Sequence, residues 1–420
     1  DRYMSVLSAI CGVKDRKPET IIKAVISAGA DLENPIKMDL LRYSASDLFW
    51  SLVHSTTGFK ASEKIDDLTN HVVLSAISRT ISSDVLSGLE SKYSDIHSGF
   101  CYDLIFNWIH GEDKKSFKNI ADYVTSNLSL LDRFNSFEIT DLQETDVLPV
   151  IDEVILSKLM YAIINKTIDS DSIIRIVEKR RTSAWYEDYT YFYEGIYQVA
   201  LMNQFYESHL NSFHHVEAKD MWKAYKNDYY QMDTFYRKFH IAFSTCLQTL
   251  HPSLDDAFKD LADYVEKEYK NWYLDQLSSN WNKVIESDLG SIGKISGLAQ
   301  QTDFYRDVVK NIDGKVFVII SDAMRYDVAY SLAKQLEIET KADVEISAQQ
   351  GIYPTITKYG MAALLPHKTL GVIENNGTTK VLVDGHPSEM SDRDGILKSY
   401  SENSVALKYK DIISMKRDDR

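Results

Sequence analysis

The segment that most constrains the fold of this chain is a run of five apolar residues, 316–320, with the sequence Val-Phe-Val-Ile-Ile. A short, mostly β-branched run of this kind predicts a strand that is buried on both faces. Ser321 and Asp322 follow at once, and apolar residues at helical spacing then continue to about residue 336. Because open α/β sheets bind ligands at the carboxyl ends of their strands, this order predicts that Asp322 lies at a ligand site.

Composition limits the classes of function that fit the chain. Its 420 residues suffice for two or three domains with sizeable cores. Lys and Arg total 47 against 62 for Asp and Glu, which gives a net charge of −15 and argues against broad electrostatic binding of nucleic acid. A local basic groove, or a nuclease that holds its substrate through metal ions, remains compatible with this charge. No apolar run approaches the roughly 20 residues that span a bilayer.

Cysteines and chain ends indicate the cellular setting. Cys11, Cys101 and Cys246 are far apart and are expected to be reduced core thiols of an intracellular, cytoplasmic protein. The chain starts at Asp1 without a signal peptide, and residues 416–420 form a charged stretch with no terminating structure. Both ends are therefore interpreted as cuts through a longer protein.

Residues 1 to about 290 are expected to be almost entirely helical, because proline is scarce there and apolar residues recur at helical spacing. A helical domain at 1–180 and an aromatic-rich helical region at 181–290 are predicted. The aromatic residues could form a stacking platform for bases. Packing between long helices is the preferred interpretation, because acidic residues interleave them. Four histidines of this region, at 214, 215, 240 and 251, could suggest a metal site, but they lack regular metal-ligand spacing.

Glycine and serine at 287–300 predict a linker, and the pattern then changes. Strands and helices alternate over 301–420, which predicts an α/β domain with a mainly parallel sheet covered by helices on both faces. Strands are expected at 315–320, 343–347, 380–384 and 405–407, and helices at 303–312, 323–337, 358–365, 391–400 and 410–415.

Two residues of this region could carry chemistry. Asp322 could bind a divalent metal through its carboxylate, or it could simply cap the following helix. Thr357 follows Pro354-Thr355-Ile356 at the expected start of a short helix, where a phosphate would be stabilised. A metal-activated threonine can attack phosphorus, although Thr357 or Thr355 could instead be a helix cap.

These motifs together resemble a known family. Val-Ile-Ile-Ser-Asp-Ala-Met-Arg-Tyr at 318–326, followed by Tyr-Pro-Thr-Ile-Thr-Lys-Tyr-Gly-Met-Ala-Ala-Leu-Leu-Pro at 353–366, is similar to the PglZ domain of BREX phage-defence systems, within the alkaline phosphatase superfamily. The resemblance extends upstream through segments 236–240, 268–274 and 301–305. Downstream it includes 383–385 and 393–397, so that it covers most of 180–420.

The resemblance implies that Asp322 is a ligand of a two-metal site, usually zinc in this superfamily. It implies that Thr357 is the nucleophile and also touches a metal. Arg325 would bind substrate phosphate or fix Asp322, unless it pairs with Asp327, for which a solvated position is expected. The further metal ligands of the family are absent after Thr357, where His367 and His386 lack partners. We expect that the chain is a fragment that ends before these ligands.

Two functional hypotheses follow. The first is a metal-dependent phosphatase or phosphodiesterase of a BREX defence system, acting through Thr357 on a phosphate ester, a nucleotide or nucleic acid, with other BREX proteins as partners. The second is a non-catalytic scaffold whose helical region binds other subunits of the defence complex.

Overall fold

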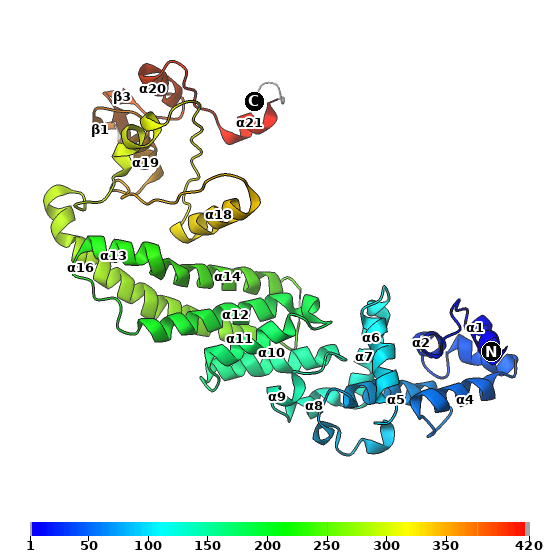
Figure 1. Cartoon of the computed structure of the whole chain (residues 1–420). Helices are drawn as coiled ribbons and strands as arrows, with labels where there is room; N and C mark the ends of the chain where they lie inside the picture. The colour runs from blue at the N-terminus through cyan, green and yellow to red at the C-terminus, as the bar shows by residue number, and fades with distance from the viewer. Residues whose placement is uncertain (1, 250, 376, 416–420) are drawn as a thin grey trace. The chain divides into compact units, whose positions relative to one another are not determined.

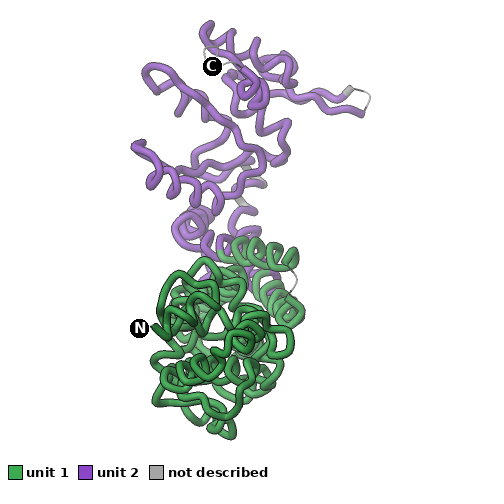
Figure 2. Tube along the Cα trace, turned by 90° about the vertical axis from the view of Figure 1, so that its right-hand side faces the viewer, with its two compact units in different colours: residues 1–208, 235–269 green, residues 209–234, 270–420 purple. Residues whose placement is uncertain are grey.

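The computed structural model describes residues 2–249, 251–375 and 377–415. The predictions about the chain ends concern residue 1 and residues 416–420, which lie outside the described residues. The chain divides into two compact units, one formed by residues 1–208 and 235–269 and the other by residues 209–234 and 270–420 (Figure 2). Both units contain segments that are distant in sequence, because the chain leaves the first unit at 209 and returns to it at 235.

The first unit is all helical in its described part (Figure 1). Three of its helices, α2, α3 and α10, begin with a proline, which lacks only an amide hydrogen that a first turn leaves unbonded. The helices of this unit are α1 Arg2–Ile10, α2 Pro18–Ser27, α3 Pro35–Arg42, α4 Ser46–Thr57, α5 Ile65–Ser78, η1 Ser83–Leu86, η2 Glu90–Lys92, α6 Ser98–Ile109, α7 Lys114–Asn127, α8 Leu130–Asn135, α9 Ile139–Leu142, α10 Pro149–Ile164, α11 Ser170–Arg180, α12 Tyr186–His209 and α15 Asp255–Lys267. Helix α14 Tyr230–Cys246 and the π-helix η4 Glu268–Leu274 contribute residues to both units, and the last residue of α12, His209, belongs to the second unit.

The aromatic residues of this unit serve mainly as core. Tyr189, Phe192 and Tyr193 on α12 are buried, and the ring of Phe192 lies 5.0 Å from that of Phe258 on α15. The helices can approach closely here because Gly195 has no side chain: a Cβ atom at this position would come within 2.7 Å of the Phe258 ring. The packing interpretation of the aromatic region is therefore confirmed for these residues. Cys11, Cys101 and Cys246 are buried free thiols, as predicted.

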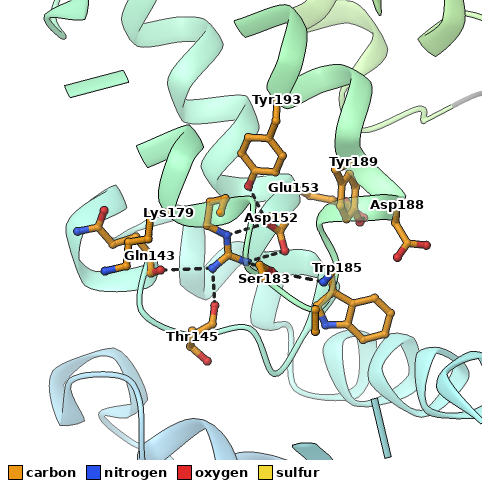
Figure 3. A network of polar contacts seen from close by, with 12 residues as sticks. Gln143, Thr145, Asp152, Glu153, Lys179, Ser183, Trp185, Asp188, Tyr189 and Tyr193 are labelled. Carbon is orange, nitrogen blue, oxygen red and sulfur yellow. Dashed lines mark hydrogen bonds and ion pairs between the residues drawn. The ribbon is translucent and has the colours of Figure 1, made fainter. Parts of the chain in front are cut away.

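A buried ion pair joins α10 and α11 (Figure 3). The guanidinium of Arg180 donates to both carboxylate oxygens of Asp152, at 2.9 and 2.7 Å, and to the Thr145 carbonyl at 2.8 Å. Tyr193 donates to Asp152 at 2.6 Å, and burial together with this carboxylate raises the pKa of Tyr193, which keeps its hydroxyl protonated. Each charge is thus offset by hydrogen bonds, as a charge so deeply buried requires.

The second unit combines helices with one small sheet in its described part (Figure 1). Its elements are α13 Ala218–Ala224, the π-helix η3 Tyr225–Tyr229, α16 Asp275–Ile292, η5 Gln301–Asp303, α17 Phe304–Asp307, η6 Val309–Asn311, α18 Tyr326–Glu339, α19 Thr357–Leu364, β1 Leu370–Asn375, β2 Thr378–Val383, β3 His386–Pro387, α20 Arg393–Tyr400 and α21 Tyr409–Ser414. The linker predicted at 287–300 starts later than expected, because α16 continues to Ile292 and ends at Gly293 in the left-handed conformation.

The sheet is antiparallel, with β2 between β1 and β3. Asp384 and Gly385 both have positive φ and form the tight turn between β2 and β3, which is the conformation that an Asp-Gly pair favours. The Asp384 carboxylate accepts from Tyr400 at 2.5 Å and from the amides of Lys368 and Thr369, and these bonds lower its pKa to about 2. Val381 and Val383 of the sheet pack with Ala362, Leu365 and Ile396 in a small core.

The mainly parallel sheet expected over 301–420 is not formed by the described residues, whose one parallel pairing is an isolated bridge between Gln300 and Gln350. The prediction of a buried strand at 315–320 is wrong for this structure. The segment has no strand conformation, and the side chains of Phe317 and Ile319 are 74% and 90% exposed. A strand requires a neighbouring strand for its backbone hydrogen bonds, and none of the described segments lies in register with it.

The remaining elements of this region follow the predictions unevenly. The strands expected at 343–347 and 405–407 are not formed, whereas β2, α18, α19, α20 and α21 occupy the predicted segments with small shifts of their ends. Helices form there because their hydrogen bonds are local, whereas an isolated strand has no such bonds. None of the helices in the described part of the chain is both long and apolar enough to cross a membrane.

Candidate functional site

The candidate site consists of Asp322, before α18, and Thr357, the first residue of α19. The Thr357 hydroxyl donates to the Oδ2 atom of Asp322 at 3.0 Å, although the residues are 35 positions apart. Both side chains are exposed. An exposed carboxylate and an exposed hydroxyl that meet in this way can face a ligand together.

Asp322 does not cap the helix that follows it. Helix α18 begins at Tyr326, and the position before it is Arg325, whose side chain makes no capping bond. Ala323, which follows Asp322, has a φ of 57°, in the left-handed region. Its backbone amide donates to the Oδ1 atom of Asp322 at 3.0 Å. This conformation turns the chain sharply after Asp322. The interpretation of Asp322 as a helix cap is therefore excluded in this structure.

Thr357 likewise does not act as a cap. The cap position of α19 is Ile356, so Thr357 belongs to the first turn and its side chain bonds to Asp322 instead. The positive end of the helix dipole provides a positive potential beside the hydroxyl. A negative charge that develops near Thr357 would be stabilised there.

Two glutamines hold the segment that leads to Thr357. Gln350 is buried. Its backbone amide donates to the carbonyl of Ala299, and its side-chain Oε1 atom accepts from the backbone amide of Ile295 at 2.8 Å. The backbone amide of Gln301 donates to the backbone carbonyl of Gln350 at 2.9 Å, and the side-chain Oε1 atom of Gln301 accepts from the backbone amide of Ile352 at 3.1 Å. The Tyr353–Pro354 bond, which follows, is cis. The sequence interpretation missed both glutamines, because single polar residues in loops carry no local signal.

Close approach to Gln301 also shapes α19. A Cβ atom on Gly360 would lie 3.3 Å from the Gln301 amide nitrogen, so glycine keeps this helix near the loop. A cavity of about 280 Å³ is lined by residues 300–303 and 350–353, with Gly293 and Lys294. Asp322 and Thr357 do not line it, so the cavity adjoins the supporting loop rather than the hydroxyl–carboxylate pair.

Arg325 lies between two buried carboxylates. Its Nη2 atom is 2.7 Å from Asp233 on α14, and its Nε atom is 3.1 Å from Asp327 on α18. The ion pair with Asp327 that the sequence offered as an alternative is present. The expectation that Asp327 is solvated is wrong, because its side chain is fully buried. Asp327 is the second residue of α18, and the partner guanidinium compensates for its burial.

The residues that could hold a metal can be judged from their donor atoms. Asp322 and Thr357 present two oxygens, which suit a hard or borderline divalent cation. In the described part of the chain no three residues among His, Cys, Asp and Glu are grouped to hold a metal. His367 bonds through Nδ1 to the Leu365 carbonyl, and His386 lies in β3. The pair therefore fits a metal only as part of a larger ligand set.

Comparison with known proteins identifies a family that part of the chain matches. Residues 303–420 match the family described as the BREX system PglZ alkaline phosphatase-like domain. These residues belong to the PglZ family. The segment 303–420, called the PglZ region below, contains Asp322, Arg325 and Thr357. The resemblance inferred from the two motifs is thus confirmed.

Two curated relatives align with nearly the whole chain. The alkaline phosphatase-like protein PglZ of Bacillus cereus (strain H3081.97) is 31% identical over 418 residues, which are 98% of this chain and 48% of the relative. The alkaline phosphatase-like protein BrxZ of Escherichia coli O9:H4 (strain HS) is 29% identical over 436 residues, with 98% and 49% covered. The chain spans about half the length of these relatives. No solved structure matches it.

Proposed function

We propose that this chain provides the helical region and the first part of the catalytic domain of a metal-dependent phosphoric ester hydrolase in a BREX defence system. Thr357 is the nucleophile and Asp322 is a metal ligand. The observation that carries this proposal is the 3.0 Å contact between the Thr357 hydroxyl and the Asp322 carboxylate, which unites the two motifs of the PglZ region. Other BREX proteins are the proposed partners.

The reaction assigns a step to each group. The Thr357 oxygen attacks phosphorus and loses its proton, the bond from phosphorus to the leaving oxygen breaks, and the leaving alcohol takes up a proton. Water then cleaves the threonine–phosphorus adduct and restores the hydroxyl. The first turn of α19 stabilises the negative oxygens of the transferring group. A divalent metal held by Asp322, zinc in this proposal, would lower the pKa of the attacking hydroxyl.

The finer fold is also part of the proposal. The exposed apolar residues of 316–320 would be covered by strands of a mainly parallel sheet, supplied together with the missing metal ligands by the remaining length that the relatives possess. Amide hydrogen exchange tests this directly. In a full-length protein the amides of 316–320 should be protected by orders of magnitude relative to this chain, and equally rapid exchange in both would contradict a sheet there.

The nucleophile is tested in the full-length protein with a chromogenic phosphodiester. Thr357→Ala should reduce turnover by at least a thousandfold, because no other oxygen replaces the attacking one. Thr355→Ala, two residues away and equally exposed, is the matched control and should keep turnover within about threefold. Undiminished turnover in Thr357→Ala would refute the assignment.

The metal ligand is tested independently of activity. Elemental analysis of the purified full-length protein should find less bound metal in Asp322→Ala than in the wild type, whereas Thr355→Ala should match the wild type. Removal of one carboxylate ligand leaves the metal with fewer donors, so a loss of most bound zinc is expected. Equal metal in all three proteins would show that Asp322 is not a ligand.

A further inference from the structure

One ion pair beside the Asp322 turn reaches outside the PglZ region, from Arg325 to Asp233. We propose that Asp233, with Tyr225 behind it, is a positioning residue that fixes Arg325 and, through it, the turn that carries Asp322. The importance of that turn rests on the proposed function, because Asp322 matters only if it is a ligand. The ion-pair geometry itself is independent of that function.

The turn needs support because its conformation is costly. Ala323 adopts a left-handed φ of 57°, in which the Cβ atom of a residue other than glycine lies too close to its own backbone. Such a conformation persists only where the surroundings hold it. On one side lies the mostly exposed segment 315–321, which pairs with no strand among the described residues. Besides the Thr357 hydroxyl, which donates to Asp322, support is available on the other side, where Arg325 and α18 lie.

Asp233 is well suited to hold Arg325. Its Oδ1 atom lies 2.7 Å from the guanidinium, and its side chain is only 5% exposed. Its Oδ2 atom accepts from the hydroxyl of Tyr225 at 2.6 Å, and the Tyr273 hydroxyl, which donates to the Tyr229 carbonyl at 2.9 Å, lies 3.4 Å from the same oxygen. Both oxygens are thus engaged, and the orientation of the carboxylate is determined. Charge-assisted bonds of this length are among the stronger polar contacts in proteins.

Aromatic contacts fix the same helices. The ring of Tyr230 lies 5.6 Å from that of Tyr326 and 4.5 Å from that of Tyr330, both on α18. Tyr326 also donates its hydroxyl to the Lys226 carbonyl at 3.3 Å, within the π-helix η3. The first turn of α18 is therefore joined to residues 225–233 by an ion pair, a hydrogen bond and ring packing. π-Helical turns frequently occur at functional sites.

This arrangement makes Arg325 a residue that positions the 322–325 turn. Two of its nitrogens contact protein carboxylates, and one of these carboxylates, on Asp327, belongs to the helix that Arg325 precedes. The guanidinium thus links α14 to the start of α18, and only Ala323 and Met324 separate it from Asp322. Loss of Asp233 would remove the 2.7 Å ion pair that links Arg325 to α14, so that the 322–325 turn could move relative to Asp233 and Tyr225.

The test uses the full-length protein and three variants. Asp233→Asn removes the charge without changing the size of the side chain, and Tyr225→Phe removes only the hydroxyl that orients it. Asp220→Asn, in an exposed aspartate on α13, is the matched control. Amide hydrogen exchange of residues 321–327 in metal-free protein measures the turn directly. Zinc affinity, measured by competition with a chelator, gives the consequence for the site.

We expect exchange over 321–327 to be at least tenfold faster in Asp233→Asn and several-fold faster in Tyr225→Phe, with no change in Asp220→Asn. Zinc affinity should fall by 10- to 100-fold in Asp233→Asn, as observed when residues that orient metal ligands are replaced. Unchanged exchange in Asp233→Asn would overturn the proposal. If Asp233→Asn fails to fold, exchange in Tyr225→Phe decides in its place.

The two proposals fail differently. If Asp322 is not a ligand, zinc binding is unchanged in Asp322→Ala, while the exchange result for Asp233→Asn still stands. If Asp233 does not position the turn, exchange is unchanged in Asp233→Asn, while Asp322→Ala still loses metal.

Discussion

Glu268 offers a test of the electrostatics of the helical unit. It is the first residue of the π-helix η4, and its Oε2 atom is buried without a hydrogen-bond partner among the described residues. Burial raises its pKa from an ordinary 4.5 to about 7, while Lys166 lowers and nearby Glu207 raises it. An ionised carboxylate in this position is therefore poorly compensated, and Glu268→Gln should relieve the cost at high pH.

The magnitude and sign follow from proton linkage. Between pH 4.5 and about 7 the side chain of Glu268 is protonated in the folded state but ionised in the unfolded state. The folded protein is therefore most stable with respect to this group below pH 4.5, and it loses that stability as the pH rises to about 7. Each pKa unit corresponds to about 1.4 kcal/mol, so the ionised side chain destabilises the folded protein by about 3 kcal/mol above pH 7. Glutamine has nearly the shape of the protonated acid and carries no charge at any pH.

Urea unfolding at pH 5 and pH 8 measures the effect. At pH 5 the free energies of unfolding of the wild type and Glu268→Gln should differ by less than about 1 kcal/mol, and at pH 8 the variant should be more stable by about 3 kcal/mol. Glu178→Gln, in an exposed glutamate on α11, controls for the removal of one negative charge. A stability difference that is the same at both pH values would refute the reasoning, because burial of the charge would then cost nothing.

Two further predictions concern packing and buried charge. Arg180→Met leaves the Asp152 carboxylate buried without its ion pair and should lower the free energy of unfolding by about 3–5 kcal/mol. The double variant with Asp152→Leu should recover much of this loss. Arg175→Met, at an exposed arginine of α11, is the control and should change stability by less than about 0.5 kcal/mol. Urea midpoints compare these proteins, and an additive loss in the double variant would contradict the argument. Gly195→Ala should destabilise by about 1–3 kcal/mol because its Cβ atom meets Phe258, while Gly395→Ala on α20, with open space around it, should stabilise by up to about 1 kcal/mol. Thermal unfolding measures both, and equal effects would show that the space around the glycine does not matter.

The sequence predicted best what depends on neighbours along the chain. The helices α18 and α19 form in the expected segments, since their hydrogen bonds join residues four positions apart. The Asp-Gly turn before β3 likewise has the conformation that its residues favour. The approach of Asp322 and Thr357 was expected only through resemblance to a family, because no local rule relates positions so far apart.

What depends on distant neighbours was missed or wrong. Residues 316–320 have the composition of a buried strand, but strand formation requires a partner that the described residues do not provide. Asp327 was expected to be solvated because a charged residue near a helix start usually is. Its burial depends on Arg325 and on the packing of α18, neither of which its immediate neighbours reveal. Asp233 carried no signal at all, because it lies in a helical segment remote from the motif.

These observations bear on how the site is defined. Segments next to Asp322 and Thr357 contact residues before 303: Arg325 pairs with Asp233, and the loop before Thr357 bonds to Gln301 and the Ala299 carbonyl. They meet at 3.0 Å although the strand expected to deliver Asp322 is not formed in this structure. Their proximity therefore does not require the sheet. A PglZ region beginning at 303 would keep every motif residue and lose these anchors, so residues 209–234 and 270–302, which share a compact unit with the motifs, belong with them.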